Sequence, residues 1–303
     1  MDELQRSIYV LKFQLAFLRN KGTAFQDWFV QIAGNAFGPD FEEVRPYGPN
    51  GDLKCDGRRI STGSIFQCYA PDTMRDGELI RKIDEDFQGA LAHWPESMQE
   101  WVLVHNDPRG LPPRVVQHLD KLRKAHAPIR ISIWSEPELL DLTMKLDLLQ
   151  LQALFGYAAS RAIVEGLVMS DLKPIIDALQ RQEPDPNDLP LTPPSAEKLE
   201  KNALSTDAAL LLRCGRLKSG LVATYFRKSS NPDLGERIAE AFRLRYDQLK
   251  ELDLPADTIF KYLQDYAGFN GEPKQQGAAL AVLAYFFDSC DIFEDPPVIA
   301  ETI

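Results

Sequence analysis

A proline-rich stretch divides this chain into two parts and limits what the residues around it can form. Residues 183–195 have the sequence EPDPNDLPLTPPS, with five prolines in thirteen residues. Proline fixes φ and lacks a backbone N–H, so this stretch cannot be a helix interior or an inner strand. We therefore expect residues 166–195 to form a helix and a linker, which separate a first domain (1–165) from a second (196–303).

Hydrophobic periodicity predicts an α/β fold for the first domain. Helices are expected where apolar residues recur every three or four positions, and strands where short apolar runs are bounded by turn residues. The predicted helices cover about 3–19, 25–37, 76–93, 113–125 and 137–165, and the predicted strands cover 44–47, 53–60, 64–70, 101–104 and 129–134. This order describes a mixed sheet flanked by helices.

The second domain has only helical patterns, so we expect an all-α C-terminal domain. The candidate helices are 208–212, 221–226, 238–252, 259–266 and 278–287. Near its end, residues 286–293 contain three Phe and one Ile. Several exposed Phe side chains would be costly, so this segment completes the domain's own core or contacts a partner subunit.

Composition and charge exclude several classes of protein. With 44% hydrophobic and 26% charged residues, the chain is neither disordered nor a membrane bundle. It has no apolar run near the roughly 18 residues of a membrane span and no signal-peptide pattern, so we expect a cytoplasmic protein without a membrane partner. The four Cys and four His lack zinc-ligand spacing. A net charge of −11 weighs against DNA binding by the isolated chain, although a local basic patch or a basic partner would change this.

One segment carries residues suited to metal chemistry. The sequence GDLKCDG at 51–57 is followed by FQCY at 66–69. A hairpin would place Asp56 and Gln67 near each other at the same end of a sheet, with both side chains in one cleft. Carboxylate and amide oxygens are ligands for Mg²⁺, or for the similar Mn²⁺. The alternative is that Asp-Gly only marks a turn and Gln67 is an ordinary polar strand residue.

Taken together, several segments resemble a nuclease family. Residues 22–26 (GTAFQ), the motif that runs from Gly51 through Asp56 to Gly57, and Gln67 follow the order seen in the Mrr-like branch of the PD-(D/E)XK nuclease superfamily. The resemblance covers about residues 20–135 and implies a restriction-endonuclease-like fold that cleaves DNA with Mg²⁺ or Mn²⁺. It also implies that Asp56 and Gln67 are catalytic metal ligands, while Gln26 stands where the helix acid usually lies.

The sequence departs from this family at the catalytic lysine. Tyr69 occupies that position, and a tyrosine with a pKa near 10 brings no positive charge. Lys54 would share Asp56's face if both lie on one strand, and Lys82 lies on the following helix, so either could supply the cation. The alternative is that both are solvated surface lysines and that the fold is kept while cleavage is lost.

A second resemblance concerns the assembly. The segments 67–71, 82–87 and 281–294 look like modules of prokaryotic ABC-three-component defence systems. This resemblance implies an antiviral effector that works with a separate SMC-like ABC ATPase and an accessory subunit, and it allows a homo-oligomer. The chain has no Walker A motif of its own, since Gly215–Gly220 lacks the Gly-Lys-Ser/Thr.

The basic residues near the motif suggest a path for DNA. Arg58 and Arg59 flank the motif strands, and Lys121 and Lys124 lie near a helix end, so together they could contact a phosphate backbone. The alternative is an ordinary solvated surface. The leading hypothesis is a Mg²⁺-dependent DNA endonuclease, in which Asp56→Ala abolishes cleavage without disturbing the fold. The second hypothesis is an inactive adaptor that binds DNA or partner subunits.

Overall fold

The chain folds into two compact units. The computed structural model describes residues 1–45, 53–180, 204–252, 254–269 and 271–289. Residues 12–156 form one unit, here called the α/β unit, while residues 1–11 and 157–303 form the other, called the helical unit. The helix α1 (Glu3–Arg19) contributes residues to both units. The proline-rich stretch at 183–195 lies outside the described residues.

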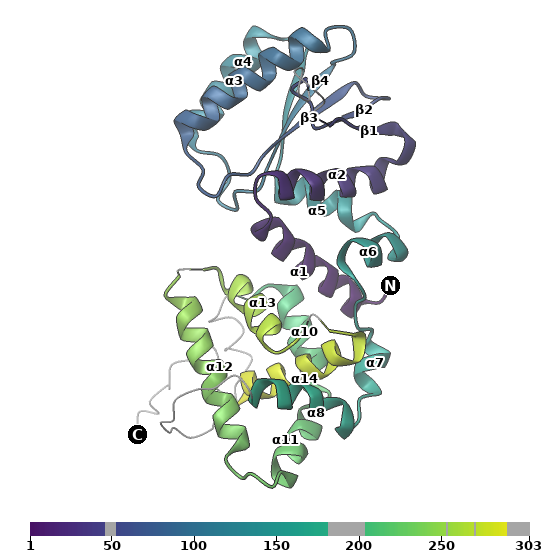
Figure 1. The fold of residues 1–303 in the computed structure, drawn as a ribbon, viewed down its shortest axis with the longest axis vertical. Helices are drawn as coiled ribbons and strands as arrows, with labels where there is room; N and C mark the ends of the chain where they lie inside the picture. Colours follow the sequence, from purple (N-terminus) through teal and green to yellow (C-terminus); the bar gives the residue numbers. More distant parts are fainter. Residues whose placement is uncertain (46–52, 181–203, 253, 270, 290–303) are drawn as a thin grey trace, which may run out of the picture. The chain divides into compact units, whose positions relative to one another are not determined.

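The α/β unit is built on a five-stranded mixed sheet (Figure 1). Its strands are β1 (Phe41–Glu43), β2 (Gly57–Arg59), β3 (Ser64–Tyr69), β4 (Glu100–His105) and β5 (Arg130–Trp134), which neighbour one another in chain order. The pairs β1–β2 and β2–β3 are antiparallel, whereas β3–β4 and β4–β5 are parallel. The parallel pairs need helical crossovers, and α3 and α4 supply them. The predicted mixed sheet flanked by helices is confirmed.

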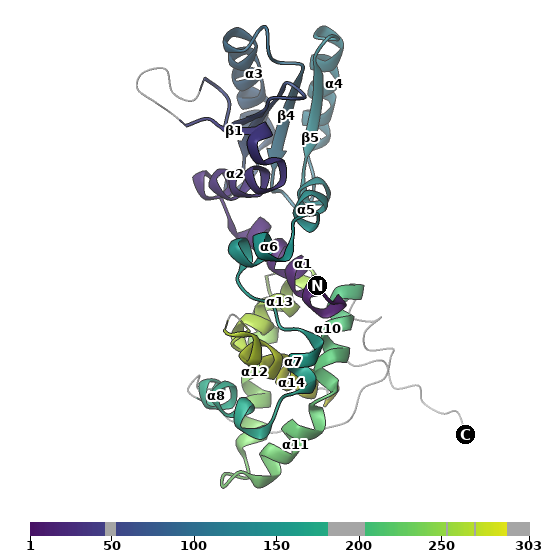
Figure 2. The ribbon, with the colours of Figure 1, turned by 90° about the vertical axis from the view of Figure 1, so that its right-hand side faces the viewer.

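Helices cover both faces of this sheet (Figure 2). On one face, α3 (Asp76–His93) and α4 (Pro113–Ala125) bury apolar side chains such as Phe87 against Trp101 of β4. On the other face, α2 (Thr23–Phe37) and α5 (Glu136–Met144) join the core around Phe66 of β3. Successive side chains of a buried strand therefore point alternately into one core and the other.

The helical unit surrounds one apolar helix, α14 (Pro273–Asp288). Residues 276–284 of α14 are all buried, as expected for a helix with neighbours on every side. The helices α7, α8, α10, α11 and α13 pack against it. The bounds in this unit are α7 (Arg161–Glu165), α8 (Met169–Gln180), α10 (Thr206–Arg216), α11 (Ser219–Lys228), α12 (Leu234–Lys250) and α13 (Ala256–Tyr266).

Most predicted helices are confirmed, but the short strands near the motif are not. The helices at 3–19, 76–93 and 113–125 have the predicted bounds, and the segment 137–165 divides into α5, α6 (Leu148–Phe155) and α7. The strand predicted at 44–47 is wrong for its described part, since β1 ends at Glu43. Of the strand predicted at 53–60, only Gly57–Arg59 is a strand. Leu53 and Lys54 have φ values of 54° and 58°, which interrupt an extended path.

The aromatic segment near the chain end divides between the core and the undescribed residues. Phe286 and Phe287 are buried in the helical unit, where the Phe286 ring contacts Phe226 and Phe242. These two side chains therefore complete the core of their own unit. Ile292 and Phe293 lie outside the described residues.

Candidate functional site

Asp56 enters the sheet directly after a left-handed turn. Leu53 and Lys54 both have positive φ, a region that residues other than glycine seldom adopt. The backbone then straightens, so that the Asp56 N–H donates to the Phe66 carbonyl at 2.9 Å and the Asp56 carbonyl accepts from Val44 at 3.3 Å. These two bonds fix Asp56 between the neighbouring segments, just before β2 begins.

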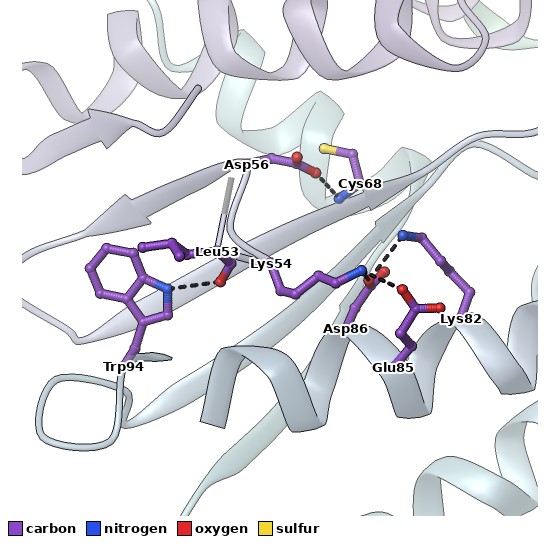
Figure 3. A network of polar contacts seen from close by, with 8 residues as sticks. All are labelled: Leu53, Lys54, Asp56, Cys68, Lys82, Glu85, Asp86 and Trp94. Carbon is purple, nitrogen blue, oxygen red and sulfur yellow. Dashed lines mark hydrogen bonds and ion pairs between the residues drawn. The ribbon is translucent and has the colours of Figure 1, made fainter. Parts of the chain in front are cut away.

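The side chain of Asp56 is bound to the backbone of β3. Its Oδ2 atom accepts a hydrogen bond from the backbone N–H of Cys68 at 2.6 Å, and Asp56 is only 2% exposed (Figure 3). A hydrogen bond to an ionised carboxylate is among the stronger ones in proteins. Burial, followed by the charge of Asp56, raises the pKa of the Cys68 thiol well above its usual value. That thiol is therefore protonated and unreactive at neutral pH.

Gln67 has different surroundings from Asp56, although the two lie on adjacent segments. Along β3, Ile65 and Tyr69 face the core under α3 and α4, and alternation places Gln67 with them, whereas Cys68 faces the opposite side. The Gln67 Oε1 atom is buried and has no hydrogen-bond partner among the described residues. An unsatisfied buried amide oxygen is unusual and requires an explanation, such as a bound ion.

Tyr69 does not replace the catalytic lysine. Burial, followed by the charge of Glu78, raises the pKa of the Tyr69 hydroxyl above 10.0. The side chain is therefore neutral at physiological pH and cannot compensate a phosphate charge. Gln26, in the first turn of α2, is half-buried and also carries no charge.

The structure brings Lys54 and Lys82 together on a carboxylate that the sequence analysis did not select. Both Nζ atoms approach Asp86 Oδ1 on α3, at 3.2 Å from Lys54 and 2.9 Å from Lys82. Lys54 also donates to Glu85 Oε1 at 2.5 Å, which raises the pKa of Lys54 and lowers that of Glu85. Figure 3 shows this group beside α3, on the other side of the strands from the Asp56 and Cys68 side chains.

Lys54 reaches this place from a turn and not from a strand. The expectation that Lys54 shares Asp56's face by strand alternation is therefore wrong. Asp86 could have been noticed from its spacing, since Lys82 precedes it by four residues on a predicted helix. Its burial to 2% exposure was not visible in the pattern.

The two arginines of β2 make ion pairs with acidic residues of β1 and of the turn before it. Arg58 Nε donates to Glu42 at 2.6 Å and its guanidinium stacks over Trp94, while Arg59 Nε donates to Asp40 at 2.7 Å. Their charges are thus partly compensated by acidic neighbours in the structure. A phosphate backbone would have to compete with these carboxylates for the arginines.

The lysines of α4 form a separate basic group. Lys121 and Lys124 are exposed on α4, which packs along β5, three strands from β2 in the sheet order. Strands lie about 4.8 Å apart, so this separation is on the order of 14 Å. The predicted DNA-contacting residues therefore form two groups, one at each side of the sheet.

Asp56 supplies a carboxylate and Gln67 an amide oxygen, which are donors of the kind that a hard cation prefers. The alternation along β3 places the Gln67 side chain on the α3 side, whereas the Asp56 side chain lies with Cys68 on the other side, so the expectation that both occupy one cleft is wrong. Mg²⁺ often takes one or two protein carboxylates and completes its shell with water and substrate phosphates. Across the described ranges, no group of three or more His, Cys, Asp or Glu residues could hold a metal ion.

Comparison with known proteins identifies the second half of the chain. Residues 170–294 match the family model CTD10, the C-terminal domain 10 of the ABC-three component (ABC-3C) systems. The match places this protein in the ABC-three-component defence systems. Membership in an ABC-3C system implies other subunits, such as an ABC ATPase. The matched residues include α8 and α10–α14 and leave the α/β unit unmatched.

Two further comparisons add no relatives. No curated protein and no solved structure matches the chain. Among the described residues, no helix is both long and apolar enough to cross a membrane.

Proposed function

We propose that this protein is the effector subunit of an ABC-3C antiphage complex and that its α/β unit cleaves DNA with Mg²⁺ or Mn²⁺. The main support is the location of Asp56, whose carboxylate lies against β3 at the end of the β2–β3 pairing. This arrangement agrees with the motif order that resembles Mrr-like nucleases. The family match of the helical unit supports a role within a multi-subunit complex.

The candidate residues differ in their part in this proposal. Asp56 would hold the metal ion, which would activate a water molecule and neutralise charge on the phosphodiester. Gln67 faces the other side of β3, so it would not share this ion. Preorganised cations are effective at stabilising negative charge on a phosphate. Lys54 and Lys82 lie beside α3 on the other side of the strands from the Asp56 carboxylate, so this role at Asp56 would fall to other residues. Arg58 and Arg59, or Lys121 and Lys124, would bind the DNA backbone and orient it.

A specific observation favours a second candidate, the inactive adaptor. The ammonium groups of Lys54 and Lys82 contact the carboxylates of Asp86 and Glu85, so two positive charges meet two negative ones. Tyr69 adds no charge to this group. A site without surplus positive charge is poorly suited to a phosphodiester transition state, and such a unit would instead bind DNA or a partner subunit.

Plasmid cleavage by the assembled complex distinguishes the two candidates. The complex is incubated with supercoiled plasmid and Mg²⁺, with Mn²⁺, or with EDTA. We expect cleavage with either metal and none with EDTA. Asp56→Asn keeps the shape of the side chain and removes its charge, so it should abolish cleavage. Asp141→Asn changes an exposed carboxylate of α5 and should leave cleavage unchanged.

The opposite results identify the adaptor. Wild-type complex that binds plasmid in a mobility-shift assay but cuts none of it with either metal would contradict the nuclease proposal. Cleavage that persists at the wild-type rate in Asp56→Asn would place the catalytic site elsewhere in the complex.

A further inference from the structure

We propose that Asp86 of α3 is the positioning residue for Asp56. In this arrangement Asp86 fixes the Lys54 ammonium group, the bound Lys54 stabilises the left-handed turn, and the turn places the Asp56 carboxylate against β3. The consequence for catalysis rests on the nuclease function proposed above. The positioning itself does not depend on that function and can be measured without it.

The turn before Asp56 needs an external restraint. Leu53 and Lys54 are consecutive residues with φ values of 54° and 58°, and each carries a Cβ that disfavours this conformation. Such backbone conformations persist where surrounding contacts hold them, and they concentrate at functional sites. The contacts that hold this turn come from α3 and the residue that follows it.

Three contacts attach the turn to α3 and to the residue that follows it. The Lys54 Nζ atom contacts Asp86 and Glu85, and the Nε1 atom of Trp94, the residue after α3, donates to the Leu53 carbonyl at 3.2 Å (Figure 3). The aliphatic part of Lys54 crosses α3 at Gly89, where a Cβ atom would collide with Lys54 Cγ. Gly89 therefore leaves the space in which the Lys54 side chain lies.

Asp86 is better suited than Glu85 to be the fixed point of this attachment. Asp86 is 2% exposed and is also contacted by Lys82 from the preceding turn of the same helix. The Glu85 side chain is 59% exposed, so water competes strongly for it. A buried carboxylate needs its cationic partners, and this requirement holds Lys54 in one place.

The position of Asp56 follows from the turn. Only Cys55 separates Lys54 from Asp56, whose N–H pairs with Phe66 and whose carboxylate accepts from the Cys68 N–H. A shift of the turn would therefore move the Asp56 carboxylate away from Cys68. The Cys68 amide proton consequently reports on the position of Asp56.

Selective ¹⁵N-cysteine labelling of the full chain tests this proposal. The chain has four cysteines, so the amide spectrum contains few signals, and the Cys68→Ser variant assigns the relevant one. In Asp86→Asn, we expect the Cys68 amide to exchange about tenfold faster with solvent than in the wild type, because its bond to Asp56 opens. The Cys214 amide lies in the helical unit and should not change.

A neighbouring carboxylate provides the matched control. Asp84 lies on the same helix but binds His118 of α4 at 2.7 Å, so Asp84→Asn should leave Cys68 exchange unchanged. Lys54→Met keeps the aliphatic side chain across Gly89 and removes only the charge. It should reproduce the effect of Asp86→Asn, and it provides the test if Asp86→Asn does not fold.

The outcomes separate this proposal from the nuclease function. Unchanged Cys68 exchange in folded Asp86→Asn or folded Lys54→Met would overturn the positioning role. Faster exchange in these variants, together with at least tenfold slower plasmid cleavage by the complex, would support both. Faster exchange with a wild-type complex that never cuts would support the positioning role and contradict the nuclease function.

Discussion

Asp56 accepts the backbone N–H of Cys68 at a position where β2 no longer pairs with β3. The ladder between the two strands ends at Gly57 and Phe66, and the 2.6 Å bond from the Cys68 N–H to Asp56 Oδ2 continues it with a side chain. The carboxylate thus takes the place of a strand carbonyl. Asp56 is therefore a structural residue of the sheet as well as the candidate metal ligand.

Asp56→Ala should destabilise the α/β unit as well as remove the proposed activity. The substitution leaves the partly buried Cys68 N–H without its Asp56 acceptor, and an unsatisfied buried donor typically costs about 1–3 kcal/mol. This differs from the expectation, based on sequence alone, that the fold is unaffected. All four Trp residues lie in the α/β unit, so tryptophan fluorescence during urea unfolding measures this unit selectively.

Asp56→Asn is the matched variant for that measurement. Asparagine retains an oxygen that can accept the hydrogen bond from the Cys68 N–H. Asp56→Asn should therefore destabilise the α/β unit less than Asp56→Ala does. Equal urea midpoints for the wild type and Asp56→Ala would show that this hydrogen bond contributes nothing to the sheet.

A glycine in the helical unit permits close contact between two helices. A Cβ atom at Gly215 of α10 would collide with the Leu280 carbonyl and the Ala284 side chain of α14. Since one obstacle is backbone, the helices would have to separate, and overpacking of this kind costs about 1–3 kcal/mol. Gly215→Ala should therefore lower the thermal transition of the helical unit, observed by circular dichroism.

Gly220 of α11 supplies the control for this substitution. It is exposed, and nothing lies within 4 Å of a Cβ atom placed there. Gly220→Ala should be neutral or stabilising by up to about 1 kcal/mol, because alanine favours the helix. Similar transitions for both variants would contradict the packing described for α10 and α14.

Acid should weaken the connection between β1 and β2. Hydrogen bonds from the Ser61 hydroxyl and then from Arg59 lower the pKa of Asp40 from 3.8 to about 2. A carboxyl group with a lowered folded-state pKa stabilises the fold above its unfolded pKa and loses this contribution as pH falls. The wild type should therefore exceed Asp40→Asn in stability above about pH 4, and the difference should vanish towards pH 2.

Melting curves of both proteins between pH 5 and pH 2, followed by tryptophan fluorescence, would measure this difference. A stability difference that stays constant over this pH range would show that Asp40 does not stabilise the fold through its charge.

The predictability of the fold differed between helices and the motif strands. The helix α3 was predicted correctly because Leu79, Ile83 and Phe87 recur every four residues and all three prove to be buried. The strand β2 has only three residues, which is too short for an alternating pattern to be recognised in the sequence. The two residues with positive φ before it are Leu53 and Lys54, and neither is a glycine that would have signalled this turn. Its conformation depends on contacts with α3 that are distant in sequence.

The candidate site was predictable only in part for the same reason. Asp56 and Gln67 could be selected because their residue types and order resemble a nuclease motif. The burial of Asp86, and its contacts with both Lys54 and Lys82, depend on how α3 packs on the sheet. A single sequence shows the spacing of Lys82 and Asp86 but not that Lys54 joins them.

The end of the chain provides a test of how this protein joins its partners. Phe286 and Phe287 are buried, and Arg216 pairs with Asp288 at 2.7 Å, so truncation before these residues would damage the helical unit itself. A chain ending at Ser289 keeps all of α14 and its pair with Arg216. We expect this shortened chain to retain the thermal transition of the full chain. Because Ile292 and Phe293 are then missing, we expect it to lose co-purification with the other subunits. Full co-purification of the shortened chain would show that the partner surface lies within the described helices instead.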